Sequence, residues 1–176
     1  MRRILIISVV IMISGLIGNQ IMAQNIKFGH INRNELIQLM PEFDSARSQL
    51  EKLNTELTNQ LELLQVEYNN KAEAYIKESK NLSDLVRQTK EQELQDFQNR
   101  MQVFQQNASN QLQEKQVALF TPITEKADKA IRAVGKESSF FYIFDLSGGH
   151  VAYFDETKSV DVLPLVKSKL PKMPEV

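Results

Sequence analysis

Apolar residues recur at spacings of three and four over about half of the chain, from Phe43 to Val134. In the first part of this stretch the repeated positions are Leu50, Leu53, Leu57, Leu61, Leu64, Tyr68, Ala72 and Tyr75. Leu50, Leu61 and Ala72 are eleven residues apart, and such a period favours straight helix packing over a left-handed supercoil. The pattern therefore predicts a long, straight helix from Asp44 to Lys80, on the order of 55 Å at 1.5 Å per residue.

The apolar pattern weakens between Glu78 and Asp84, where Asn81 and Ser83 suit a turn or a helix cap. We predict that the chain reverses here and returns as a second long helix; one uninterrupted helix is the alternative. The apolar face of the returning helix is formed by Leu94, Phe97, Met101, Phe104, Ala108, Leu112, Leu119 and Ile123. Pro122 is expected to kink or loosen this helix, and Gly135 is a natural position for its C-cap.

Short β-prone runs flank the two helices. Ile26 to Ile31 alternates apolar and polar residues, which predicts a strand. Phe140 to Leu146 and Val151 to Phe154 read as two more strands, and Gly148-Gly149 between them predicts a β-hairpin.

Short helices complete the chain on either side. Glu35 to Met40 is expected to be helical, and Pro41 then starts the long helix. Asp161 is expected to cap a last helix, Val162 to Leu170. The fold class is therefore α+β: a small β-sheet body from which a long antiparallel helical hairpin, similar to a coiled coil, protrudes.

The N-terminus has the pattern of a secretory signal peptide. Arg2 and Arg3 precede an apolar run that fades at Gly15 and Gly18, and Ile21-Met22-Ala23 then precedes Gln24. We expect residues 1–23 to be removed after Ala23. An uncleaved membrane anchor is the alternative, but polar and glycine residues from Ser14 to Asn19 shorten the apolar run. The chain has no Cys, so disulfides, thiolate metal sites and lipid attachment at a cysteine are excluded.

Charge and chemistry limit the possible functions further. Cleavage after Ala23 leaves 19 basic and 22 acidic residues, a net charge near −3, which argues against general nucleic-acid binding. His30 and His150 are the only histidines, and neither has a carboxylate or second ligand at helical spacing. We therefore predict no catalytic, cofactor or metal site, and a protein that is not an enzyme.

The thin apolar stripe of the returning helix has two readings. Its periodicity is typical of a core between two helices. Bulky or flexible residues such as Phe97, Met101 and Phe104 also suit an adaptable surface for unstructured clients. Both readings hold at once if two helices cover the stripe only in part.

Several motifs in order resemble the Skp/OmpH family of periplasmic chaperones. The resemblance covers nearly the whole mature chain. It begins with Leu39-Met40-Pro41-Glu42-Phe43 and the Leu-spaced arm, and continues with the run from Leu119 to Ile131, LFTPITEKADKAI. It ends with Phe141-Tyr142-Ile143-Phe144-Asp145 and Asp161-Val162-Leu163.

This resemblance implies a homotrimer whose strands form a barrel-like body, with three helical arms around a cavity. It divides the chain into a signal peptide (1–23), a first body segment (24–43), an arm (44–134) and a second body segment (135–176). The expected oligomerisation residues are Ile26, Phe28, Ile31, Phe141, Ile143, Val151 and Tyr153. The expected client-binding residues on the arm are Tyr68, Tyr75, Leu82, Leu85, Phe97, Met101 and Phe104.

The implied function is an ATP-independent holdase for unfolded outer-membrane proteins in the periplasm, without a cofactor. The best-known members are strongly basic, whereas this mature chain is slightly acidic, which argues against direct contact with anionic lipid or lipopolysaccharide. The alternative is a non-catalytic coiled-coil scaffold or spacer of the envelope with one fixed, folded partner.

Overall fold

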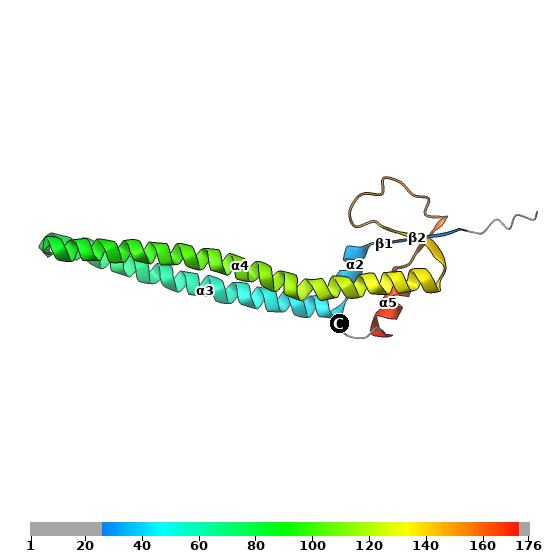
Figure 1. The fold of residues 1–176 in the computed structure, drawn as a ribbon, viewed down its shortest axis with the longest axis horizontal. Coiled ribbons are helices and arrows are strands. Elements are labelled where there is room, and N and C mark those ends of the chain that lie inside the picture. The colour runs from blue at the N-terminus through cyan, green and yellow to red at the C-terminus, as the bar shows by residue number, and fades with distance from the viewer. Residues whose placement is uncertain (1–25, 173–176) are drawn as a thin grey trace, which may run out of the picture.

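The computed structural model describes residues 26–172, so the expected signal peptide and its cleavage position at Ala23 lie outside the described residues. Figure 1 shows a long rod of two helices with a small sheet and short helices at one end. The rod consists of α3 (Pro41–Glu78) and α4 (Asp84–Glu137), joined by a short 3₁₀ turn, η1 (Ser79–Asn81). The other elements are β1 (Lys27–Ile31), α2 (Arg33–Gln38), β2 (Phe140–Asp145), β3 (Ser159–Asp161), α5 (Leu163–Lys169) and η2 (Leu170–Lys172).

The starts of the helices follow from local residue chemistry. The side chain of Asn32 accepts a hydrogen bond from the Glu35 N–H at 3.1 Å and caps α2. Pro41 occupies the first turn of α3 after an extended Met40, where its missing N–H costs nothing. The Ser83 hydroxyl caps α4 by accepting from the Val86 N–H at 3.5 Å. The reversal therefore falls where the apolar pattern weakened.

The end of α4 differs from the expectation. The helix runs on through Pro122 and past Gly135 to Glu137, so the predicted C-cap at Gly135 is wrong. The N–H of Ser138 still donates to the Val134 carbonyl at 2.9 Å, and the left-handed residue that ends the helix is Ser139, with φ 54°. Gly135 instead lies beside Ile143, whose Cδ1 would be 3.4 Å from an added Cβ.

The sheet is parallel throughout, with the order β2-β1-β3. The predicted β-hairpin is therefore wrong: residues 151–154 form no strand, and the third strand is β3 (Ser159–Asp161). The ring of Phe154 packs against His30 at a tilt of 45°, with ring centroids 4.7 Å apart. Asp155 then closes a turn by accepting from the N–H and hydroxyl of Thr157, and the chain pairs with the other edge of β1.

The core lies where the body meets the base of the rod. It combines Ile31, Leu36, Ile37 and Met40 with Ala46 of α3, the α4 residues Ile123, Ala127, Ala130 and Val134, and Val162 and Val166. Ala127 and Ala130 are fully buried, and such small side chains allow the body elements to approach α4 closely. Gly29 serves the same purpose in β1, because an added Cβ would lie 2.9 Å from Cγ1 of Val162.

Beyond this core the rod is held by one narrow interhelical stripe. All eight predicted stripe positions of α3, from Leu50 to Tyr75, are buried or half-buried, which confirms the eleven-residue pattern. Leu57 and Phe97 are its most buried side chains, 8% and 2% exposed. None of the helices within residues 26–172 combines the length and apolar composition that a membrane span requires.

Candidate functional surfaces

One face of the sheet presents a cluster of aromatic side chains. The rings of Phe28 and Tyr142 are parallel, with an angle of 2° between them, and their centroids are 6.5 Å apart. Phe144 stacks beside both rings, and Phe141 meets Phe28 and Tyr142 edge-on. Phe141 is 63% exposed and Tyr142 56%. Exposed apolar surface of this kind is typical of an interaction site.

The predicted oligomerisation residues differ in exposure, and two of them belong to the core or pack against it. Ile26, Phe141 and Tyr153 are exposed, and Phe28 and Val151 are half-buried. Ile31 is 1% exposed and belongs to the core, and Ile143 packs against it. These two residues therefore support the body from inside.

Sequence reasoning missed Tyr142 and Phe144 as members of the aromatic face. The register of the parallel pair shifts between Lys27 and Phe28, because Lys27 lies opposite Phe140 but Phe28 lies opposite Tyr142. Phe141 is thus the extra residue of a bulge, which changes the side of the sheet to which the following residues point. Simple alternation along β2 cannot reveal this shift.

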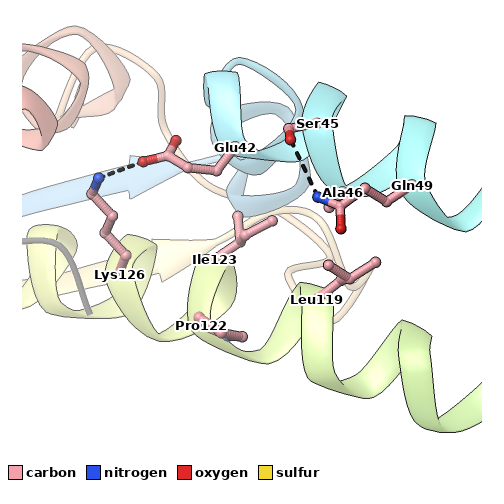
Figure 2. A pocket seen from close by; sticks show the side chains of 8 residues that line it. All are labelled: Glu42, Ser45, Ala46, Gln49, Leu119, Pro122, Ile123 and Lys126. Atoms are coloured by element: carbon pink, nitrogen blue, oxygen red, sulfur yellow. Dashed lines mark hydrogen bonds and ion pairs between the residues drawn. The ribbon is translucent and has the colours of Figure 1, made fainter.

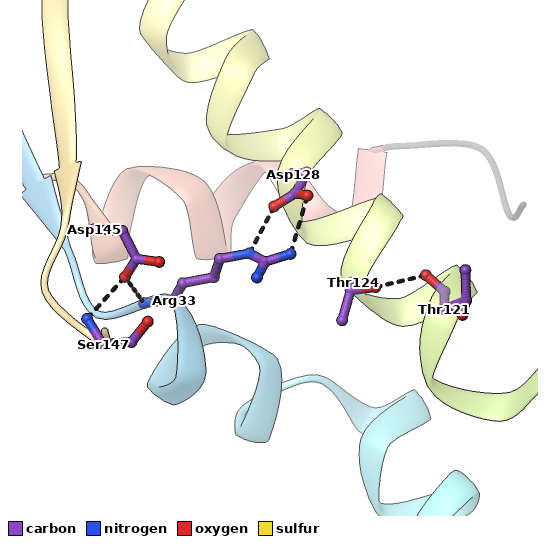
Figure 3. A network of polar contacts seen from close by, with 6 residues as sticks. All are labelled: Arg33, Thr121, Thr124, Asp128, Asp145 and Ser147. Atoms are coloured by element: carbon purple, nitrogen blue, oxygen red, sulfur yellow. Dashed lines mark hydrogen bonds and ion pairs between the residues drawn. The ribbon is translucent and has the colours of Figure 1, made fainter. Parts of the chain in front are cut away.

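A network of polar contacts ties this sheet to α2 and α4. The Arg33 guanidinium donates to both carboxylate oxygens of Asp128, at 2.7 and 3.0 Å, and the Arg33 N–H donates to Asp145 at 3.3 Å (Figure 3). The Ser147 N–H donates to the same Asp145 oxygen at 2.9 Å. Burial acts to raise the pKa of Asp145, but the hydrogen bonds from Ser147 and Arg33 outweigh it and hold the pKa below its ordinary value.

A shallow groove of about 370 Å³ lies at the junction of body and arm (Figure 2). Ala46, Leu119 and Ile123 form its apolar part, and the ion pair between Lys126 and Glu42 closes one end. The hydrogen bond from Lys126 lowers the pKa of Glu42. The pair joins the start of α3 to α4 and so helps to fix the direction in which the arm leaves the body.

Most of the predicted client-binding residues lie between the two helices of the arm. The ring of Phe97 packs against Tyr68, with centroids 6.2 Å apart, and Gln98 donates to the Tyr68 hydroxyl. Tyr75 donates to Glu91 across the same interface. Met101, Phe104 and Leu82 are half-buried, whereas Leu85 is 74% exposed. The aromatic members therefore join the helices, and Leu85 is the member that offers most surface.

Exposed aliphatic side chains occur elsewhere on the arm, and sequence reasoning missed them. They are Leu63, Val66, Ile76, Val86, Val103 and Val117, which are 41–70% exposed. Leu63, Val66, Val103 and Val117 fall between positions of the interhelical stripe in the helical repeat, which was the signal that could have identified them. Ile76 and Val86 lie just beyond the ends of the stripe. The arm therefore carries apolar surface that its own helix pairing leaves uncovered.

Between residues 26 and 172, no group of three Asp, Glu or His side chains could hold a metal ion. His30 makes a 2.9 Å hydrogen bond between Nδ1 and the Ser159 hydroxyl, and its ring packs at a tilt against Phe154. Its contacts are those of a residue that fixes β3 and the preceding loop.

Comparison with known proteins agrees with this architecture. A family model described as outer membrane protein (OmpH-like) matches residues 27–170. The fold is similar to the crystal structure of a candidate outer membrane chaperone (OmpH-like) from Caulobacter crescentus CB15, with a TM-score of 0.72. The two chains are 10% identical, and the similarity covers 86% of this chain and 87% of the other. No curated protein sequence matched the chain.

Proposed function

The chain belongs to the family described as outer membrane protein (OmpH-like), and from this premise we propose that it is an ATP-independent holdase chaperone. Its clients are unfolded outer-membrane proteins in the periplasm, which it protects from aggregation. The observation that carries the proposal is the uncovered apolar surface of the arm. Separate aliphatic side chains, 41–74% exposed, lie along α3 and α4 outside the contacts that these two helices make with each other. Scattered apolar contacts of this kind suit weak binding at many points of an unfolded chain.

The body serves as the assembly unit in this proposal. β2 and β3 are the edge strands of the described sheet, and each has one neighbour, so backbone groups on the outer edges are available for pairing. The aromatic face around Phe28 and Tyr142 adds apolar surface beside these edges. A homotrimer closed through these surfaces would hold three arms around a common space. The predicted signal peptide supports delivery to the periplasm.

An aggregation assay tests the holdase proposal directly. A β-barrel outer-membrane protein is diluted out of urea with increasing amounts of the mature protein, and light scattering is followed over time. We expect suppression of aggregation near one trimer per client, without ATP. Aggregation that continues unchanged at a several-fold excess of the mature protein contradicts the proposal.

A further inference from the structure

The two helices of the arm differ in the chemistry of their polar residues. In α4, ten of the twenty residues from Leu94 to Gln113 are Gln or Asn, and two are charged. In α3, the segment from Glu51 to Lys71 carries four glutamates and two lysines. Tyr68 and Gln98 are hydrogen-bonded to each other, so these segments run beside one another along the arm. One helix is therefore nearly neutral where its neighbour is acidic.

Both charges of the α4 segment are engaged within the arm itself. Asp96 accepts a hydrogen bond from the Gln92 amide at 2.8 Å. The Arg100 guanidinium lies over the ring of Phe97, 4.4 Å from its centroid, which is a cation–π contact. What this part of α4 offers to solvent is mainly amide and aliphatic surface.

These groups gather on one side of α4, which we call the amide face: Asn99, Val103, Gln106, Asn110, Gln113 and Val117. All six are exposed, and at 3.6 residues per turn they fall within about 80° of one another. They lie on the opposite side of the helix from Phe97, Met101 and Phe104. Val103 and Val117 are 58% and 59% exposed. A shallow hollow of about 490 Å³ adjoins this face. It is lined by Asn110, Gln113 and Val117 and, at its edge, by Glu114.

A client that covers α3 therefore loses more free energy to desolvation than one that covers α4. An apolar chain laid on α3 near Leu63 and Val66 would desolvate Glu62 and Glu67, and desolvating a carboxylate costs more than desolvating an amide. Gln and Asn side chains both donate and accept hydrogen bonds, so they can pair with the backbone of an extended segment while Val103 and Val117 contact its side chains. These valines are about 21 Å apart along the helix, the length of about six strand residues.

We propose that clients bind along the amide face of α4 through uncharged extended segments with alternating apolar and polar side chains, and that α3 contributes little. This inference rests on the proposed holdase function. Since the six residues of the amide face are uncharged and Glu114 lies only at its edge, the affinity depends little on the net charge of the client. It is correspondingly insensitive to salt, because screening weakens only charge–charge attraction.

Two matched double variants test which helix binds. Asn99→Asp with Asn110→Asp adds two carboxylates to the amide face, and Asn59→Asp with Asn70→Asp adds two to the outer side of α3. In both pairs the residues are exposed and eleven positions apart. Asn99 and Asn110 accept hydrogen bonds from Gln95 and Gln106 through their side-chain oxygens, and Asp retains these acceptors. Circular dichroism and light-scattering mass verify that fold and assembly are unchanged.

The readout is the dissociation constant for a fluorescently labelled, urea-unfolded β-barrel outer-membrane protein. We expect the α4 pair to weaken binding about tenfold or more and the α3 pair to change it less than about twofold. For the wild-type protein we expect less than about a threefold change between about 0.05 M and 0.5 M salt. Equal effects of the two pairs, no effect of either, or a tenfold loss at high salt overturns the inference.

Failure of the inference can be distinguished from failure of the proposed function. If the wild-type protein binds and protects the client but the two pairs behave alike, the holdase function stands and the amide face is excluded as the binding surface. If the wild-type protein neither binds nor protects, the proposed function fails, and the inference fails with it.

Discussion

Arg33 and Asp128 join two elements that are 95 residues apart in the sequence, through two parallel hydrogen bonds of 2.7 and 3.0 Å. Arg33 begins α2 and Asp128 lies in α4, so the pair fixes the body against the base of the arm. The Arg33 side chain is 32% exposed and that of Asp128 41%. Water and salt therefore reduce its strength, although the bidentate geometry is the most favourable one available to such a pair.

We expect Arg33→Met to lower the free energy of unfolding by about 1 kcal/mol, because Asp128 loses its partner while the apolar stem of the side chain is kept. Urea unfolding followed by circular dichroism measures this change. Glu73→Gln is the control, since it removes the more exposed Glu73–Lys77 pair of the arm and should change stability by less than about 0.5 kcal/mol. Equal effects of the two substitutions would count against a structural role for Arg33.

Acid should destabilise the body through Glu42 and Asp145, whose pKa values both lie below their ordinary values in the folded chain. The unfolded chain then binds protons at these carboxylates more readily than the folded chain, so protonation favours unfolding. Their contribution is fully present above the pKa values that these carboxyl groups have in the unfolded chain, about 4, and is lost as the pH falls through the lower pKa values of the folded chain. Urea midpoints measured between about pH 7 and pH 3 should therefore decrease toward low pH.

Two substitutions separate the groups responsible for this acid sensitivity. Glu42→Gln should reduce stability at neutral pH and make the decrease below about pH 5 shallower, because one titrating group is gone. Glu73→Gln, on the exposed part of the arm, should leave the slope as it is. A Glu42→Gln variant with the wild-type slope would contradict the assignment to Glu42.

Tyr142→Asp should separate the proposed trimer into single chains. Tyr142 is 56% exposed, so the folded monomer tolerates the new carboxylate, whereas an assembled aromatic face would have to bury it unpaired. Multi-angle light scattering gives the mass, and circular dichroism verifies that the chain is folded. Leu63→Asp places the same charge on the arm and should leave the mass unchanged. A wild-type mass for Tyr142→Asp would exclude this face from the assembly.

The sequence predicts the helical part of the fold well, because that part depends on local signals. The period through Leu50 and Leu61, the break at Pro41 and the cap at Ser83 each follow from residues within a few positions of one another. The stripe also locates the contacts of the arm, since only one side of each helix can face its neighbour.

The sheet could not be predicted in the same way. The pairing of its strands joins segments more than a hundred residues apart. The choice between a hairpin and a parallel third strand depends on whether the third segment pairs with β2 or with the edge of β1 that β2 leaves free. The Gly148-Gly149 pair predicts an antiparallel hairpin, yet Ser159–Asp161 forms the third strand. The shifted register at Phe28 also leaves Phe141 and Tyr142 exposed and turns Ile143 toward the core. No local sequence pattern encodes that shift.

Phe97→Ala should loosen the arm and leave the body intact. Phe97 is 2% exposed and packs against Tyr68 between the two helices of the arm, so truncation leaves a cavity there. Burial of this kind is worth about 3 kcal/mol or more. The loss is local, because the body core around Ala127 and Val166 is a separate cluster.

Hydrogen exchange measured by mass spectrometry distinguishes a local from a global effect. For Phe97→Ala we expect faster exchange in the parts of α3 and α4 around Tyr68 and Phe97, with unchanged protection of β1 and of α4 beyond Ile123. Val103→Ala is the matched control, because Val103 is 58% exposed on the outer side of the same helix and should leave exchange as it is. Faster exchange throughout the body of Phe97→Ala would show instead that arm and body unfold together, so that the arm could not adapt to a client while the assembly stays folded.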